Sequence, residues 1–323
     1  MPQSSTNAPL SRDDRILGSI IGQFLGDALC LGSHWHYDFA KRDAAYPNGI
    51  HGFEQPIDGH YHAKRRSGDF THYGDAGLVL LQSVAARGCF DHRDYGRRLI
   101  DYFSNPNYPG YLDKATKGTI ANAHAGADFD YQQGADDMQT ITISRAAPVV
   151  ALHARDPELA AVIARAVRVC QDNDEAVAST QFYAEILRRL LAGEAFRDAV
   201  ENALALNTKA WDGRLRDYWH EAQAMQNQSV SDATGEFGRA CYLKSTLPSC
   251  LHAALKHGDD ARTALLETAR AGGDNASRAC VVGAWLGALH GLSGLPADWL
   301  DRLNAQAEVM GLAQQVAAIS PQD

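Results

Sequence analysis

The sequence has 323 residues, of which 45% are hydrophobic and 21% are charged, and its formal net charge is −9. This composition is typical of a globular protein with a large core. The negative net charge argues against a large positively charged surface that would bind nucleic acid or an anionic membrane. A helix N-terminus can still bind a local anion. We therefore expect a small-molecule or protein-linked ligand, and neither a nucleic-acid nor a membrane partner.

The N-terminal segment and the cysteines indicate where the protein resides. Residues 1–12 are polar and lack the hydrophobic segment of a signal peptide, and no later stretch reaches the roughly 20 hydrophobic residues of a membrane span. The six cysteines form no CxxC pair, which is typical of buried free thiols in a reducing compartment. We expect a disordered tail over residues 1–12 and a cytoplasmic protein, whose oligomeric state the sequence does not indicate.

Hydrophobic residues recur with helical spacing along most of the chain. The first predicted helix, over residues 16–28, also carries Gly18, Gly22 and Gly26 on a second face. Each glycine costs about 1 kcal/mol of helix propensity relative to alanine, so this face should pack closely against another helix. Further helices are predicted over residues 76–86, 95–103, 114–125, 141–152, 158–170, 175–191, 196–206, 211–225, 247–256, 261–271, 276–292 and 297–310.

Two segments interrupt the helical pattern. Residues 35–73 contain prolines, glycines and several histidines, and a loop of this length inside a domain is usually functional or disordered. Residues 226–238 are polar and are predicted to form a surface loop. The sequence contains no convincing alternation typical of a strand, no linker and no internal repeat. We therefore predict an all-α fold with a single domain over residues 13–318.

Two glycine-rich acidic turns each precede a helix of small residues. The first is the stretch 71–77, THYGDAG, and the second is the stretch 272–277, GGDNAS. Helix capping explains an Asp, Asn or Ser at these positions. Capping requires neither the two glycines before Asp274 nor the small residues behind both turns. Such features would allow two helix N-termini to approach and to direct oxygen ligands toward a shared hard cation such as Mg²⁺.

Four motifs carry a resemblance to a known family: Gly18–Asp27 (GSIIGQFLGD), Tyr73–Asp75 (YGD), Arg145–Pro148 (RAAP), and the stretch from Gly272 through Gly291. In this order, and over residues 15–295, they resemble the ADP-ribosylglycohydrolase family. The resemblance implies an orthogonal helical bundle with a dinuclear Mg²⁺ centre in a central cleft. It also implies hydrolysis of an N- or O-glycosidic bond to the ribose of an ADP-ribosyl group.

The metal ligands depart from the family pattern, which reads Ser/Thr-Asp-Asp in the first turn and Asp-x-Asp-Ser/Thr in the second. By the resemblance, Asp75, Asp274 and Ser277 occupy ligand positions, whereas the other three positions carry Gly or Ala and supply no oxygen. Residues 30–37, which match the region of a catalytic glutamate in the family, hold no carboxylate. Since Mg²⁺ depends on carboxylate charge, we predict a divergent branch that binds one Mg²⁺ or Mn²⁺ ion weakly or binds none.

Asp75 and Asp274 are the candidate catalytic carboxylates, because glycoside cleavage passes through an oxocarbenium-like state that a nearby carboxylate stabilises. A histidine can transfer the proton at neutral pH. The candidates are His34 or His36 after the first helix, and His72 before the first turn. Capping, stacking and hydrogen bonding in loops are the alternative roles of these histidines. Placed beside Asp75, they would also suit a softer ion such as Zn²⁺ or Mn²⁺.

Candidate ligand-binding residues surround the two turns. Trp35 and Tyr37 could stack on a base or a sugar, or pack in the core. Arg278 could bind a phosphate, or pair with a nearby acid. The set is completed by His36, Gly273 and Asn275. Asp136 and Asp137 are expected first as caps at a helix start and only second as site residues.

Two classes of function follow from these residues. One is hydrolysis of a glycosidic bond in an ADP-ribosyl or related ribosyl compound at a modified, metal-poor centre, with another small glycoside as a variant. The other is a non-catalytic relative that binds a nucleotide-like ligand or has a structural role, for which the family's lens crystallins are a precedent. In a hydrolase Asp75 and Asp274 should converge in an open cleft, whereas in a structural relative capping bonds should bury them.

Overall fold

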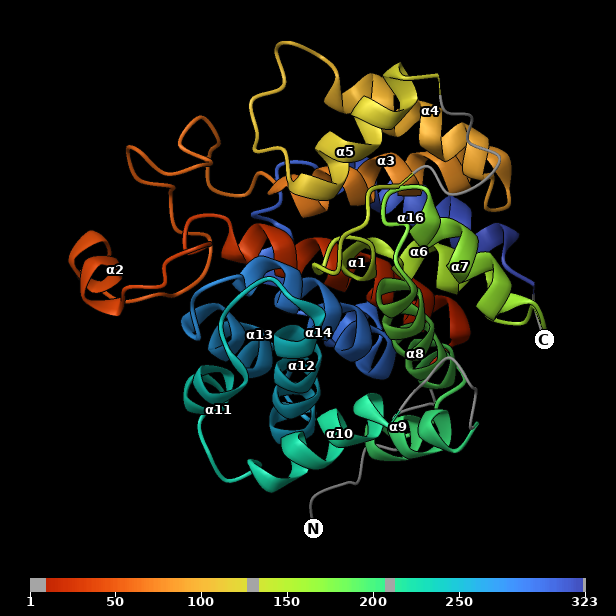
Figure 1. The fold of residues 1–323 in the computed structure, drawn as a ribbon. Coiled ribbons are helices and arrows are strands. Elements are labelled where there is room, and N and C mark those ends of the chain that lie inside the picture. The colour runs from red at the N-terminus through yellow and green to blue at the C-terminus, as the bar shows by residue number, and fades with distance from the viewer. Residues whose placement is uncertain (1–9, 127–133, 207–212, 322–323) are drawn as a thin grey trace.

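The computed structural model describes residues 10–126, 134–206 and 213–321, and the regular structure in these ranges is helical apart from three isolated β-bridges. This confirms the predicted all-α class (Figure 1). The α-helices of the described residues are α1 (Arg12–Cys30), α2 (Phe39–Ala45), α3 (His72–Arg87), α4 (His92–Phe103), α5 (Lys114–His124), α6 (Ala147–His153), α7 (Leu159–Arg168), α8 (Asp174–Leu191), α9 (Phe196–Ala205), α10 (Arg214–Ala224), α11 (Val230–Phe237), α12 (Leu243–His257), α13 (Ala261–Arg270), α14 (Asn275–His290), α15 (Ala297–Leu300) and α16 (Gln306–Ile319). The 3₁₀-helices are η1 (Ile143–Arg145) and η2 (Leu292–Gly294).

Helices α1 and α14 lie at the centre of the bundle and pack through their backbones (Figure 1). A Cβ atom on Gly22 would lie 2.1 Å from the carbonyl oxygen of Gly283. The same approach recurs one turn to either side, between Gly18 and Gly287 and between Gly26 and Ala279. The order of these pairs shows that the helices are antiparallel, and the contact confirms the expected close packing of the glycine face. The C-terminal end of α1 therefore lies beside the N-terminal end of α14.

Helix α3 also begins at this meeting point. A Cβ atom on Gly77 would be 3.2 Å from Gln23 Nε2 in α1. One turn earlier, a Cβ atom on Gly74 would be only 2.3 Å from Asp27 Oδ2. Three helix ends thus converge, namely the C-terminal end of α1 and the N-terminal ends of α3 and α14.

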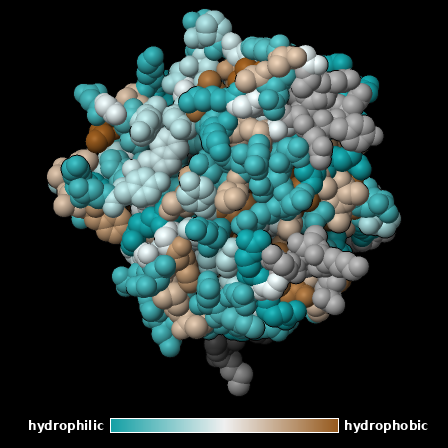
Figure 2. Space-filling model, viewed as in Figure 1, coloured by the Kyte–Doolittle hydropathy of each residue, from teal (hydrophilic) through white to brown (hydrophobic). Residues whose placement is uncertain are grey.

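The rest of the bundle surrounds this centre. One hydrophobic core cluster includes described residues from Ile16 in α1 to Ala317 in α16, as expected of the single domain that we propose for residues 13–318. In Figure 1, α3, α4 and α5 lie on one side of α1, and α9 through α13 lie on the other. Figure 2 shows hydrophilic residues over most of this face, with hydrophobic residues scattered among them. None of the described helices is long and apolar enough to span a membrane.

Two of the predicted loops contain short helices. Within residues 226–238, Ser229 caps α11 and Val230 is buried. Within residues 35–73, Asp38 caps α2. A helix of about two turns contains too few hydrophobic positions to reveal a period, and the sequence pattern therefore missed both.

Three further local predictions were wrong. The helix predicted over residues 141–152 is divided into η1 and α6, and the helix predicted over residues 297–310 is divided into α15 and α16. Pro148 lies in the first turn of α6, where its missing N–H favours the start of a new helix. Asp136 and Asp137 do not begin a helix, because they lie in an irregular segment where Asp137 accepts a backbone hydrogen bond.

Two predictions concern the chain end and the cysteines. Ser11 and Arg12, at the end of the predicted tail, belong to the cap and the first turn of α1. The part of the tail up to residue 9 lies outside the described residues. All six cysteines are free thiols. Cys89 is exposed and Cys241 is half-buried, whereas the other four are buried as expected.

Candidate functional site

The segment after α1 pairs with the turn before α14. The Trp35 N–H donates a 2.8 Å hydrogen bond to the Gly273 carbonyl, and the Gly273 N–H donates one of 3.0 Å to the His36 carbonyl. Gly272 and Gly273 have φ angles of +67° and +61°, a region that favours glycine. A Cβ atom on Gly273 would also lie 2.3 Å from the Arg239 carbonyl oxygen. The two glycines thus let the segment after α1 reach the first turn of α14.

Asp274 stands at the N-cap position of α14, yet its side chain makes no capping hydrogen bond. Its Oδ2 accepts hydrogen bonds from the Tyr73 hydroxyl at 3.1 Å and from the Ser277 hydroxyl at 2.9 Å. Its Oδ1 lies 3.6 Å from His34 Nε2 and has no hydrogen-bond partner among the described residues. Burial raises the pKa of Asp274, and the charge of Arg278 opposes the rise. Asp274 therefore keeps one oxygen unengaged at the start of α14.

Asn275 fixes the protonation of the buried His34 ring. Asn275 Nδ2 lies 2.8 Å from the Ala269 carbonyl oxygen, which can only accept, and 2.9 Å from Ser33 Oγ. With the amide nitrogen oriented there, Asn275 Oδ1 accepts the hydrogen bond from His34 Nδ1 at 3.2 Å. A neutral imidazole that is protonated at Nδ1 carries its lone pair at Nε2, the nitrogen that faces Asp274.

His62 and His72 lie beside His34, and we call these three residues the histidine cluster. One ring nitrogen of each lies within 4.8 Å of the others, and all three side chains are buried. Neither ring nitrogen of His62 or of His72 has a hydrogen-bond partner in the described part of the chain. Burial lowers the pKa of His62 to about 2 and that of His72 to about 4, and it also lowers the pKa of His34. Neutral rings at pH 7 favour the role of a base or a ligand over that of an acid.

Aromatic rings lie between the histidine cluster and solvent. Trp35, whose φ angle is +59°, stacks on His62 with ring centroids 5.6 Å apart and an interplanar angle of 17°. Trp35 also makes edge contacts with Tyr61 at 5.1 Å and with Tyr111 at 4.7 Å. Trp35 is half-buried and Tyr61 is 67% exposed, so these rings form the outer side of the site. Stacking of Trp35, or of the exposed Tyr37, on a ligand stays a prediction.

Asp75 has a different set of partners from Asp274. Its Oδ2 forms an ion pair with Arg65 and accepts a 2.7 Å hydrogen bond from the Tyr108 hydroxyl. Burial raises the pKa of Asp75 to about 6, although Arg65 favours the charged form. No hydrogen bond or ion pair joins Asp75 to Asp274 within the described ranges. The sequence did not predict Arg65 or Tyr108, because both lie in irregular segments whose path the helical pattern does not determine.

Asp27, at the end of the first motif, is a third buried carboxylate. It accepts hydrogen bonds from the Thr71 N–H at 2.8 Å and from the Thr71 hydroxyl at 2.5 Å. Burial raises the pKa of Asp27 to about 7. The residue thus ties the end of α1 to the cap of α3 and fills the space beside Gly74. Asp27 could have been predicted as a site residue from its position at the end of the Gly18–Asp27 motif.

These contacts do not fit a dinuclear Mg²⁺ centre. Mg²⁺ requires charged oxygen ligands in a near-octahedral arrangement. Arg65 already neutralises Asp75, and Asp27 fills the space in which a larger side chain of the first turn would lie. The hydroxyl of Ser277, a predicted ligand, donates to Asp274. A single weakly bound Mg²⁺ or Mn²⁺ ion stays a prediction.

Two other predicted ligand-binding residues have partners within the protein. Arg278 is buried and its Nη2 donates to the Gly272 carbonyl, while its Nε and Nη1 have no hydrogen-bond partner among the residues described. The ring of His36 stacks on His60 with centroids 5.6 Å apart. Direct contact of Arg278 or His36 with a ligand stays a prediction.

Comparison with known proteins identifies the family. A family model described as ADP-ribosylglycohydrolase matches residues 8–323. The chain belongs to this family. The finding confirms the resemblance that the four sequence motifs carry.

The relatives of this chain match most of its length. Crystallin J1A of Tripedalia cystophora is 27% identical over 321 residues, which cover 94% of this chain and 96% of the relative. The ADP-ribosyl-[dinitrogen reductase] glycohydrolase of Rhodospirillum rubrum is 24% identical, with 91% and 92% covered. A solved structure described as an ADP-ribosylglycohydrolase-related protein complex has a TM-score of 0.72 at 22% identity and covers 96% of this chain and 99% of its own. That likeness shows a shared fold.

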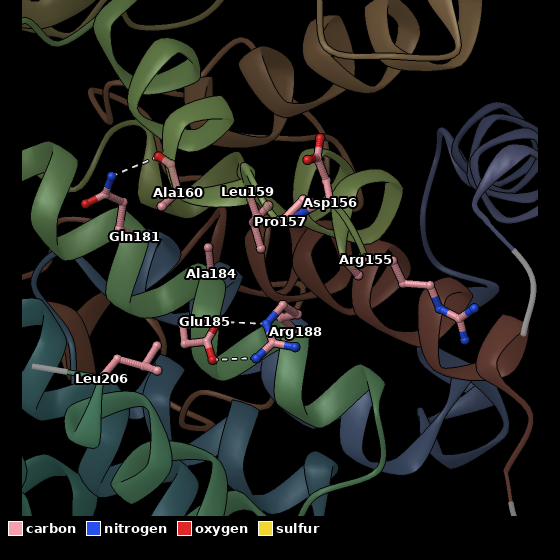
Figure 3. A pocket seen from close by; sticks show the side chains of 11 residues that line it. Arg155, Asp156, Pro157, Leu159, Ala160, Gln181, Ala184, Glu185, Arg188 and Leu206 are labelled. Carbon is pink, nitrogen blue, oxygen red and sulfur yellow. Dashed lines mark hydrogen bonds and ion pairs between the residues drawn. The ribbon is translucent and has the colours of Figure 1, made fainter. Parts of the chain in front are cut away.

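A surface hollow of the protein, drawn in Figure 3, lies apart from the candidate site. It has a volume of about 480 Å³ and is lined mainly by α7, by α8 and by the turn between α6 and α7. Glu185 and Arg188, which line it, form an ion pair (Figure 3). Neither carboxylate of the acidic turns nor any member of the histidine cluster lines it.

Proposed function

We propose that the protein hydrolyses the N- or O-glycosidic bond to ribose in an ADP-ribosyl or related ribosyl compound. The observation that carries this proposal is the buried pair of Asp274 Oδ1 and His34 Nε2. These atoms face each other at 3.6 Å, and neither has a hydrogen-bond partner among the described residues. Family membership and the relative in Rhodospirillum rubrum support this class of reaction. Small and protein-linked substrates both suit it.

A carboxylate and a neutral imidazole supply two of the groups that cleavage by water uses, a stabilising charge and a proton acceptor. A water molecule held between Asp274 and His34 would transfer a proton to His34 Nε2 as its oxygen attacks the ribose C1″. The charge of Asp274 would stabilise the oxocarbenium-like transition state, and the leaving group would depart with the electron pair of the glycosidic bond. Both side chains are fully buried, so a substrate reaches them only when the groups that cover them move.

Release of ADP-ribose tests the proposal. The full chain is incubated with ADP-ribosylated arginine and ADP-ribosylated serine, and free ADP-ribose is measured by chromatography. We expect Asp274→Asn and His34→Gln to lower turnover by about 100-fold or more. His252→Gln is the matched control, because His252 is a buried histidine of α12 that contacts the Met225 carbonyl. Equal turnover by Asp274→Asn and the wild type would exclude this role of Asp274.

A structural role is the second candidate, and the burial of both carboxylates favours it. Asp75 is 3% exposed and Asp274 is 0% exposed, and a crystallin is among the relatives. In that case calorimetry with ADP-ribose, with and without Mg²⁺ or Mn²⁺, should detect no binding by the wild-type chain. Binding that Asp274→Ala abolishes would instead support a ligand at the second acidic turn.

A further inference from the structure

The histidine cluster carries an inference beyond glycoside hydrolysis. We propose that His34, His62 and His72 bind one divalent transition-metal ion, with Zn²⁺ as the best fit and with Asp274 Oδ1 or water as the fourth ligand. The ion would take the lone pair of His34 Nε2, so in the ion-bound protein this nitrogen would not act as the base proposed above. Zinc binding is therefore tested independently of glycoside cleavage. The site differs from a dinuclear Mg²⁺ centre in its ligands, which are nitrogens rather than carboxylate oxygens.

The unengaged nitrogens are the first observation behind this proposal. His34 Nε2 and both ring nitrogens of His62 and of His72 have no hydrogen-bond partner in the described ranges, although all three rings are buried. Buried polar atoms of this kind are normally paired, because an unpaired one costs free energy. Stacking of the rings covers their faces and leaves the lone pairs in the ring planes unsatisfied. A shared cation satisfies one nitrogen from each ring together.

Distances within the cluster suit a four-coordinate ion. Ligands around a tetrahedral Zn²⁺ lie about 3.4 Å apart, given Zn–N distances of about 2.0–2.1 Å. Asp274 Oδ1 and His34 Nε2 are already 3.6 Å apart. The three ring nitrogens lie within 4.8 Å of one another. The cluster therefore needs to contract by about 1.5 Å at most, which side-chain rotation can supply.

The surroundings of His34 match those of a metal-bound histidine. Asn275 Oδ1 accepts from His34 Nδ1, which holds the lone pair of Nε2 toward the centre, as outer partners of metal-bound histidines commonly do. Trp35 packs on His62, and the Tyr73 ring lies 4.0 Å from that of His72. These rings form a hydrophobic shell that limits access of solvent.

The ligand set favours Zn²⁺ over Mg²⁺. Imidazole nitrogen suits Zn²⁺ and neighbouring transition metals, whereas Mg²⁺ prefers oxygen ligands and carboxylate charge. Asp274 Oδ1 lies 3.6 Å from His34 Nε2, while Asp274 is outside the group of donor atoms that lie within 4.8 Å of one another. Three histidines with an open fourth position are also the arrangement of a catalytic zinc site.

Zinc retention tests the site without any assay of activity. The full chain is stripped with a chelator, dialysed against buffered Zn²⁺ and analysed for metal, and the Kd is measured by calorimetry. We expect one Zn²⁺ per wild-type chain, and a Kd at least about 100-fold weaker in His62→Gln and in His72→Gln. His252→Gln, the buried histidine of α12, should bind as the wild type does. Millimolar Mg²⁺ should not displace the zinc.

X-ray absorption at the zinc edge keeps the proposal testable if a variant fails to fold. On the wild-type chain we expect a first shell of nitrogen and oxygen with the scattering of three imidazole rings. A first shell that contains sulfur would overturn the proposal. So would a first shell of oxygen without imidazole nitrogen. So would wild-type protein that retains no zinc, which would leave buried water as the partner of the ring nitrogens. Loss of zinc from His252→Gln to the same extent would overturn it as well.

Discussion

The two acidic turns share a sequence pattern and differ in what covers the carboxylate. Asp75 pairs with Arg65 and Tyr108, so protein groups engage its charge. Asp274 keeps Oδ1 unengaged beside neutral histidines. A Gly-Asp pair before a helix of small residues therefore does not by itself define a ligand site. The segment that packs over the turn determines which partners the carboxylate has.

Removal of Arg65 should have the largest effect on the free energy of unfolding. Arg65→Ala leaves Asp75 buried without its counter-charge, and loss of one partner of a buried ion pair costs about 3–5 kcal/mol. Urea unfolding followed by circular dichroism measures the loss. The double variant Arg65→Met with Asp75→Leu removes both charges and should recover most of it. If Arg65→Ala is as stable as the wild type, the ion pair does not stabilise the first turn.

Asp27 should make stability depend on pH. Burial raises its pKa from 3.8 to about 7, so the folded protein binds this proton more tightly than the unfolded chain does. The resulting stabilisation is complete below about pH 4 and is lost as the pH rises through about 7. Asp27→Asn cannot titrate, and it should gain about 4 kcal/mol relative to the wild type between pH 4 and pH 8, because each pKa unit corresponds to about 1.4 kcal/mol.

Calorimetric unfolding at several pH values checks this difference. The nearby charge of Asp75 also raises the pKa of Asp27, so Asp75→Asn is the control for that contribution. The stability curves of Asp27→Asn and of the wild type could instead run parallel over this range. That result would show that Asp27 stays ionised in the folded protein.

Gly74→Ser would restore an oxygen at a ligand position of the family. We expect a loss of about 2 kcal/mol, because the added Cβ lies 2.3 Å from Asp27 Oδ2. We also expect no Mg²⁺ binding by calorimetry, since Arg65 still neutralises Asp75. Gly77→Ser, whose Cβ meets Gln23 at 3.2 Å, is the milder control in the same helix. A Gly74→Ser variant that is stable and binds Mg²⁺ would contradict the structural role of the first turn.

Asp274→Asn should have the smallest effect on stability, less than about 1 kcal/mol, while it abolishes turnover. The asparagine oxygen can still accept from Tyr73 and Ser277, and its amide faces the lone pair of His34. Thermal unfolding and turnover are measured on the same samples. Asp75→Asn is the matched comparison and should be the less stable of the two variants. If Asp274→Asn is instead the less stable variant, the partners of Asp75 do not stabilise the protein more than those of Asp274.

Hydrophobic periodicity was sufficient for the long helices, because a buried helix repeats its pattern over several turns. The spacing of Gly18, Gly22 and Gly26 also predicted a close helix contact, which α14 supplies. The short α11 was missed, and two predicted helices proved to be divided. Interruptions and two-turn helices depend on tertiary packing, which a local pattern does not contain.

The candidate site was predictable where it coincides with helix ends. His34 follows α1 and Asp274 precedes α14, so the antiparallel packing of these helices brings the two residues together. His72 lies at the start of α3 and joins them. His62 and Arg65 were not predicted, because they lie in the irregular segment between α2 and α3. No period determines the path of that segment.

The glycine contact between α1 and α14 also governs the mechanics of the site. Main-chain atoms alone set the helix spacing at Gly22 and Gly283, so no side chain there can repack to absorb a change. A side chain added at Gly18 would collide with the backbone of Gly287 and push the two helices apart there. Because α1 is one continuous helix that ends just before His34, such a displacement would change the position of His34 relative to Asp274. The contact that sets the relative position of His34 and Asp274 therefore lies outside the site itself.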